Sequence, residues 1–149
     1  MRPSEYLSAI CRPLVFAFRE DPAAISKAWA AVVALGQFAD YLAAHRQISK
    51  RDARSLVEAI FPRFDLISDV CNASKHFELT DPRRTARPGY SISHLRVGRG
   101  AAFSDGTFYS DGSSHSDSPD VVRADYGSEH VDLQHLCADC LSALETIPD

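Results

Sequence analysis

The stretch AWAAVVALGQFA, residues 28–39, is the longest uncharged and largely apolar run of the chain. It holds twelve residues, fewer than the roughly 18 to 20 that a helix needs to cross a bilayer. Asp21 and Pro22 precede it as a capping acid followed by a proline suited to the first helical position. We therefore predict a helix from Pro22 to about His45. Apolar side chains surround most of its circumference, which places it at the centre of a bundle.

Three further helices are predicted around this central one, because apolar residues recur at helical spacing behind recognisable start signals. Two of the starts are serines, and the second serine opens a weak form of the capping box with Asp52. The third start is a proline, which also ends the preceding helix. Residues 1–79 thus read as a half that resembles a four-helix bundle. The predicted helices begin at Ser4, Ser49 and Pro62, and the last two end near Ile60 and Phe77.

The second half, residues 88–149, has a different composition and predicts strands followed by one helix. Asp105-Gly106 is a strong signal for a two-residue hairpin turn, and residues 131–147 carry an apolar helical stripe. Because helices and strands are segregated along the chain, the fold class is expected to be α+β, in a single domain spanning residues 1–149. The predicted strands are Tyr90–Val97, Ala101–Phe103, Thr107–Tyr109 and Asp120–Tyr126.

Charge and cysteine content narrow the function classes. The formal net charge is −4, and residues 1–75 hold ten Lys/Arg and eight Asp/Glu while residues 76–149 hold six and twelve. This balance excludes a uniformly basic nucleic-acid binder. A chain of 149 residues needs no disulfide to fold, so its four cysteines indicate a reducing compartment. With no signal core near the N-terminus and no membrane-spanning run, we expect a cytoplasmic protein.

A row of polar side chains marks the last predicted helix of the first half. Asp65, Asp69, Asn72 and His76 fall within roughly 60° of arc on a helical wheel at 100° per residue. A histidine next to Asp69 or Asn72 could be oriented as a general acid or base. The alternative is a structural role. Asp and Asn are unfavourable inside a helix, and buried hydrogen bonds between helices would also offset that cost.

The spacing Asn72-x-x-x-His76 resembles the motif of the HEPN superfamily, helical proteins of bacterial defence and toxin systems. Asp69–Leu79, together with Phe38–Leu42, also resembles a group of uncharacterised bacterial proteins in which Asn-x-x-Lys-His-Phe ends a helix. The resemblance covers about residues 23–80. It implies a homodimer and, in active members, metal-independent RNA cleavage by an Arg and a His through attack of the 2′-hydroxyl.

Carried over by position, the resemblance makes His76 the acid/base and Asn72 its polar partner. Cys71 stands where the family keeps Arg, and a thiol cannot replace a cation that steadies phosphate charge. Lys75 could supply the cation from a different angle. Catalysis is therefore the second use that we predict for Asn72, Lys75 and His76, after a cluster that locks helices together.

Three other features suggest binding rather than catalysis. Asp40 follows the apolar run and requires a partner if it is buried, for which Lys75 or His76 is suitable. Several arginines, Arg84 and Arg87 among them, could form a phosphate-binding face or could balance the acidic loop residues 105–132. Cys137-x-x-Cys140 could hold zinc with His130 or His135, but both thiols also fit the core, so we expect no metal and no cofactor. The candidate binding residues are Asp40, Asp69, Arg84 and Arg87.

These observations leave three hypotheses. The first is a HEPN-like, non-catalytic interaction module with a protein or RNA partner, acting in a defence or regulatory system. The second is a metal-independent endoribonuclease that uses His76 with Lys75 and Asn72. The third is a small-molecule or nucleotide-binding protein with a pocket between the fourth helix and the sheet.

Overall fold

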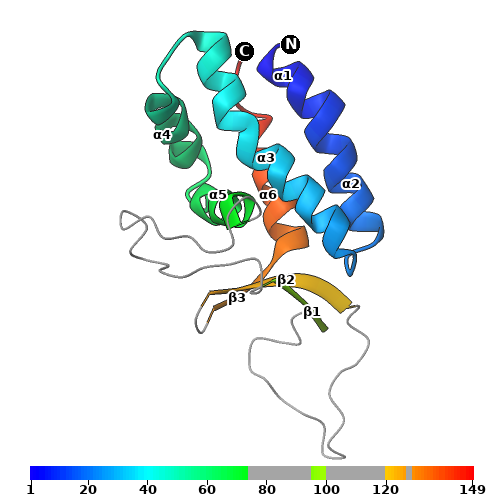
Figure 1. Cartoon of the computed structure of the whole chain (residues 1–149). Coiled ribbons are helices and arrows are strands. Elements are labelled where there is room, and N and C mark those ends of the chain that lie inside the picture. Colours follow the sequence, from blue (N-terminus) through cyan, green and yellow to red (C-terminus); the bar gives the residue numbers. More distant parts are fainter. Residues whose placement is uncertain (74–94, 100–119, 127–128) are drawn as a thin grey trace, which may run out of the picture.

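The structure, a computed structural model, describes residues 1–73, 95–99, 120–126 and 129–149. Helices make up most of this part of the chain, and a small antiparallel sheet lies across one end of them (Figure 1). The predicted α+β class is confirmed. The elements are α1 (Pro3–Tyr6), the π-helix η1 (Leu7–Cys11), α2 (Arg12–Glu20), α3 (Ile25–Arg46), α4 (Lys50–Ile60), α5 (Phe64–Ala73), β1 (Leu95–Arg99), β2 (Asp120–Tyr126), β3 (Glu129–Asp132) and α6 (Leu133–Leu144).

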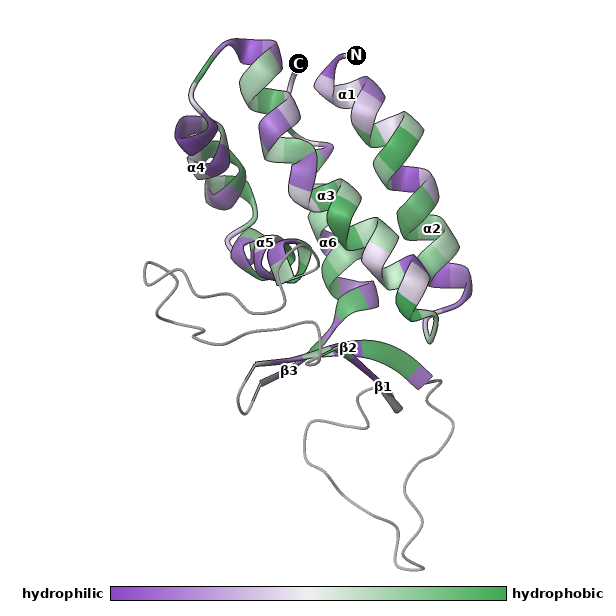
Figure 2. Ribbon diagram, viewed as in Figure 1, coloured by the Kyte–Doolittle hydropathy of each residue, from purple (hydrophilic) through white to green (hydrophobic). Residues whose placement is uncertain are grey.

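Helix α3 is the centre of the bundle, as the apolar run predicts. It packs against α2, α4, α5 and α6, and Leu35, Phe38 and Leu42 on it have no exposed surface. Figure 2 shows long hydrophobic stretches on α3 and α6, whereas the outer side of α4 is hydrophilic. Among the described residues, none of the helices combines the length and the hydrophobicity that membrane spanning requires.

The first helix is continuous from α1 to α2 but widens in the middle into the π-turn η1. The amide of Arg12 donates to the carbonyl of Leu7, five residues earlier. Pro13 explains the wider turn, because a proline has no N–H and its ring clashes with the carbonyl four residues before it. The helix begins at Pro3 in the first helical position, so the expectation that Ser4 caps it is wrong.

Two predicted helix starts are also wrong, for one shared reason. Pro22 and Pro62 each occupy the second position of a four-residue turn, a site that favours proline as strongly as the first helical position does. Helices α3 and α5 therefore begin after these turns, at Ile25 and Phe64. The turns are closed by hydrogen bonds from the amide of Ala24 to the carbonyl of Asp21 (3.1 Å) and from the amide of Phe64 to the carbonyl of Phe61 (2.9 Å).

The sheet has the order β1-β2-β3 in the described part of the chain, and both pairs are antiparallel. Strand β2 coincides with the predicted strand Asp120–Tyr126, and β1 overlaps the predicted Tyr90–Val97. Strand β3 takes Val131 and Asp132, which the sequence had assigned to the last helix. The helix starts later because the Asp132 carboxylate caps it, accepting from the amides of Gln134 (2.8 Å) and His135 (3.3 Å).

The remaining strand predictions, Ala101–Phe103 and Thr107–Tyr109 with the Asp105-Gly106 turn, lie outside the described residues. The inner face of the sheet packs on α6 and α3. Its contribution to the core includes Val122, Ala124 and Val131, all buried.

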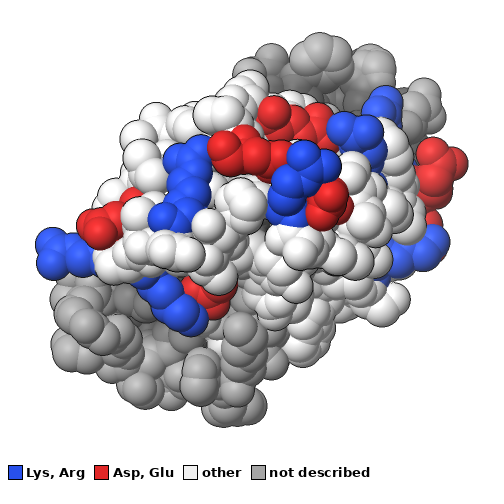
Figure 3. Space-filling model, turned by 90° about the horizontal axis from the view of Figure 1, so that it is seen from above, with Lys and Arg blue, Asp and Glu red and all other residues white. Residues whose placement is uncertain are grey.

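The two termini meet at the end of the bundle opposite the sheet (Figure 1). The Asp149 carboxylate accepts from the backbone amide of Ser4 at 2.9 Å and from the Ser4 hydroxyl at 2.7 Å. Arg46, at the end of α3, donates to the carbonyl of Pro148. Seen from this end, basic and acidic side chains alternate over the surface and no large area has a single sign (Figure 3).

Candidate ligand-binding groove

A polar groove of about 250 Å³ opens between α3, α4 and α5. Its walls come from three helices that the sequence places in order, and short turns bring α4 back beside α3 and α5. We call it the α3–α4–α5 groove. The lining residues are Gly36, Gln37, Ala39 and Asp40 of α3, Lys50 and Arg54 of α4, and Phe64, Ser68, Cys71 and Asn72 of α5.

Gly36 and Cys71 line the groove where α3 and α5 cross closely. A Cβ atom added to Gly36 would lie 2.8 Å from the Cβ and 2.9 Å from the Sγ of Cys71, distances that packed carbon atoms do not reach. Only glycine therefore allows the two helices to approach this far. Cys71 is 4% exposed, so the residue at the position where the HEPN motif keeps Arg is part of a helix-packing contact.

Ser68 gives the groove its most unusual feature. Its side chain is buried, with 6% of the residue exposed, and it lines the groove. Within the described part of the chain its hydroxyl has no hydrogen-bond partner. Gln37 and Asn72, which are partly buried and line the same groove, also have no side-chain hydrogen bond to a described residue. Buried polar groups are nearly always satisfied by protein, water or ligand, so these side chains mark a place for bound polar atoms.

Two ion pairs form the charged rim of the groove. Lys50 Nζ lies 3.1 Å from Asp40 Oδ2, and Arg54 Nε lies 2.6 Å from Glu58 Oε1, one helical turn along α4. All four side chains are at least 36% exposed. Among the described residues Arg54 makes its side-chain hydrogen bond through Nε, which leaves its two terminal nitrogens as further donors.

Asp40 is not the buried carboxylate that the sequence suggested. Its side chain is 56% exposed and pairs with Lys50. Other helices cover most of α3, but Asp40 lies on the part of its surface that lines the groove. Asn72, another predicted site residue, lies in the groove with Asp40. The expected partners Lys75 and His76 lie outside the described residues, as do Arg84 and Arg87.

Asp69, which the helical wheel put in one row with Asn72, is buried, with 5% of the residue exposed. It does not line the groove. The whole of α5 from Leu66 to Cys71 is buried. Of the predicted polar row, Asp69 is therefore enclosed in the bundle, Asp65 and Asn72 are partly buried, and His76 lies outside the described residues.

The Cys-x-x-Cys pair belongs to the core. Cys137 and Cys140 are fully buried on α6, and burial raises the pKa of both thiols. Their neighbours His130 and His135 are instead held by carboxylates, His130 Nδ1 by Asp125 Oδ1 at 2.7 Å and His135 Nδ1 by Asp132 Oδ2 at 2.8 Å. No group of three or more potential ligands suited to a metal ion occurs among the described residues.

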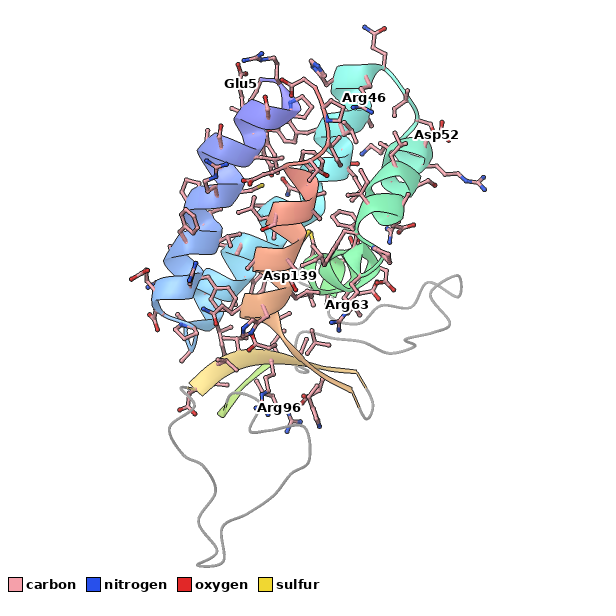
Figure 4. All side chains as sticks on the ribbon, turned by 180° about the vertical axis from the view of Figure 1, so that it is seen from behind. Glu5, Arg46, Asp52, Arg63, Arg96 and Asp139 are labelled. Atoms are coloured by element: carbon pink, nitrogen blue, oxygen red, sulfur yellow. The ribbon has the colours of Figure 1, made fainter. Side chains whose placement is uncertain are left out.

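Arg96 supports the interpretation that the arginines of the second half balance acidic residues. It lies on the outer face of the sheet (Figure 4), and its Nε is 3.4 Å from Asp125 Oδ2. Asp125 thus joins all three strands, with Arg96 on one oxygen and His130 on the other.

Five groove residues on which the binding argument depends were not predicted from the sequence: Gly36, Gln37, Lys50, Arg54 and Ser68. A signal was present for Gly36, because a glycine inside an apolar helix costs about 1 kcal/mol relative to alanine and requires a packing reason. Arg54 and Ser68 gave no such signal, since each matches the ordinary pattern of its own helix.

Comparison with protein-family models, curated proteins and solved structures finds no match to this chain. The chemistry of the groove is therefore the basis on which a function can be proposed.

Proposed function

We propose that this chain is a non-catalytic binding module with a HEPN-like helical core, and that it takes a small polar ligand in the α3–α4–α5 groove. The observation that carries the proposal is the Ser68 hydroxyl, which is buried in the groove without a partner among the described residues. Leaving a polar group in this state costs about 1–3 kcal/mol. A ligand that supplies the missing hydrogen bond recovers that cost on binding.

The packing of Cys71 supports a module without catalysis. The HEPN cleavage reaction uses an Arg at this position, and here a small side chain fills a close crossing against Gly36. A long cation at residue 71 would have to displace α3 or leave the crossing. The resemblance that suggests this core also suggests the setting, a bacterial cytoplasmic defence or regulatory system in which the module acts as a homodimer.

Thermal unfolding in the presence of a library of small polar metabolites tests the binding function. Anything that binds only the folded state stabilises it by mass action, by about 2.7 kcal/mol at a concentration 100 times Kd. We expect at least one compound to raise Tm of the wild type and to have no effect on Ser68→Leu, in which the side chain fills the groove. Ser68→Ala should remain folded, because its hydroxyl contributes no hydrogen bond to a described residue. A library in which no compound raises Tm would contradict the proposal.

Incubation with mixed RNA in EDTA tests the absence of catalysis. We expect no cleavage at any protein concentration. Cleavage by the wild type that disappears in His76→Ala would show instead a metal-independent ribonuclease.

A further inference from the structure

Opposite charges stand on different helices of the α3–α4–α5 groove. Asp40 on α3 is the one acidic residue of the lining, and Lys50 and Arg54 on α4 are the two basic ones. Glu58, outside the lining, pairs with Arg54, so these four side chains have no net charge. A groove of this kind has little to hold a multiply charged anion, but it can pair with both ends of a molecule that carries one charge of each sign.

The atoms left available match such a molecule. The terminal nitrogens of Arg54 form the planar pair of donors that binds a carboxylate with two hydrogen bonds. The Asp40 carboxylate is 56% exposed beside Lys50, and a carboxylate accepts several hydrogen bonds, so it can also accept from an ammonium group. The Lys50 side chain is 78% exposed, the more exposed member of this pair.

Neutral polar groups line the same groove as the charged ones. The Ser68 hydroxyl can both donate and accept hydrogen bonds. The side-chain amides of Gln37 and Asn72 can accept through their oxygen and donate through their nitrogen. The volume of about 250 Å³ lies just below the roughly 300–1,000 Å³ of sites for drug-sized ligands. The occupant is therefore small and polar along its whole length.

We propose that the α3–α4–α5 groove binds a free amino acid or a close zwitterionic relative, with its carboxylate on Arg54, its ammonium on Asp40 and a polar side chain at Ser68 and Asn72. This proposal rests on the binding function proposed above and specifies its ligand class.

Isothermal titration of the full chain with the free protein amino acids tests it, with inorganic phosphate as the anion without an ammonium group. We expect at least one polar amino acid to bind. Its amide, which lacks the carboxylate, and its N-acetyl form, which lacks the ammonium, should each bind at least about tenfold more weakly, because each loses a charge-assisted hydrogen bond. These comparisons change the ligand and so do not depend on a variant that folds.

Substitutions in the protein should mirror the changes in the ligand. Arg54→Gln should weaken the binding of the amino acid but leave the binding of its amide unchanged. Asp40→Asn should weaken the binding of the amino acid but leave the binding of its N-acetyl form unchanged. Arg51→Gln is the matched control, because Arg51 is exposed on the same helix and does not line the groove.

The outcomes separate this proposal from the one on which it rests. One outcome is that no amino acid binds, while phosphate or another metabolite binds and Ser68→Leu abolishes that binding. In that case the groove is a binding site and the zwitterion assignment is wrong. The assignment is also wrong if the amide and N-acetyl forms bind as tightly as the free amino acid. If no compound of any class binds, both proposals are wrong.

Discussion

A single pair of small residues determines how closely the two walls of the groove approach each other. Gly36 and Cys71 meet where α3 crosses α5, at a distance that leaves no room for a methyl group on Gly36. The same contact encloses Cys71, which is only 4% exposed. At this position the side chain serves the packing of α5 on α3.

Gly36→Ala should lower the free energy of unfolding by about 1–3 kcal/mol, the usual cost of overpacking, even though alanine is the better helix former by about 1 kcal/mol. Chemical denaturation measures this as a lower midpoint at unchanged slope. Gly98→Ala on β1 is the control, because the nearest atoms to an added Cβ there are 3.9 and 4.0 Å away. Removing the opposing side chain in Gly36→Ala/Cys71→Gly should recover part of the loss as a coupling energy. An unchanged midpoint in Gly36→Ala would mean that the two helices are farther apart than this.

At the scale of elements, the sequence correctly predicts the helices that have regularly spaced apolar residues and an unambiguous start signal. Helix α4 is the clearest case, since Ser49 caps it as expected, its oxygen accepting from the amide of Asp52 at 3.1 Å. The starts at Pro22 and Pro62 failed because proline fits a turn and a first helical turn equally well. Strand β3 was missed because Glu129–Asp132 is only four residues long, too short for alternation to be distinguished from the start of the apolar stripe that follows.

The Ser49 cap also helps to position the groove residues Lys50 and Arg54, because both lie in the first two turns of α4. Ser49→Ala should lower the free energy of unfolding by about 1 kcal/mol through the loss of the cap. It should also speed amide hydrogen exchange in the first turn of α4, since a helix end without its cap frays. Ser55→Ala, an exposed substitution on the same helix, should change neither quantity. Equal exchange in Ser49→Ala and the wild type would show that packing alone holds this end of α4.

At the scale of the whole molecule, the candidate site shows where reading one chain segment at a time stops. Asn72 and Asp40 were found because each is a polar residue on a largely apolar helix. Arg54 and Ser68 could be recognised only once α3, α4 and α5 were packed together, since the spacing within a helix does not say which faces of different helices meet. The same limit applies to the contact between the termini, in which Ser4 and Asp149 are 145 positions apart.

That contact makes a pH-dependent contribution to stability. The two hydrogen bonds from Ser4 lower the pKa of the Asp149 carboxyl below its usual 3.8. A depressed folded-state pKa means that the stabilisation is fully present above the unfolded pKa and is lost as pH falls through the folded one. Asp149→Asn should therefore destabilise the protein at neutral pH, and the difference from wild type in urea midpoint should shrink as pH falls below about 4. Asp139→Asn is the matched control, because Asp139 is an exposed carboxylate on α6 (Figure 4). If the midpoints of wild type and Asp149→Asn differ by the same amount at pH 7 and at the acid limit, the carboxylate charge does not hold the termini together, and the hydrogen bonds from Ser4 act as neutral ones.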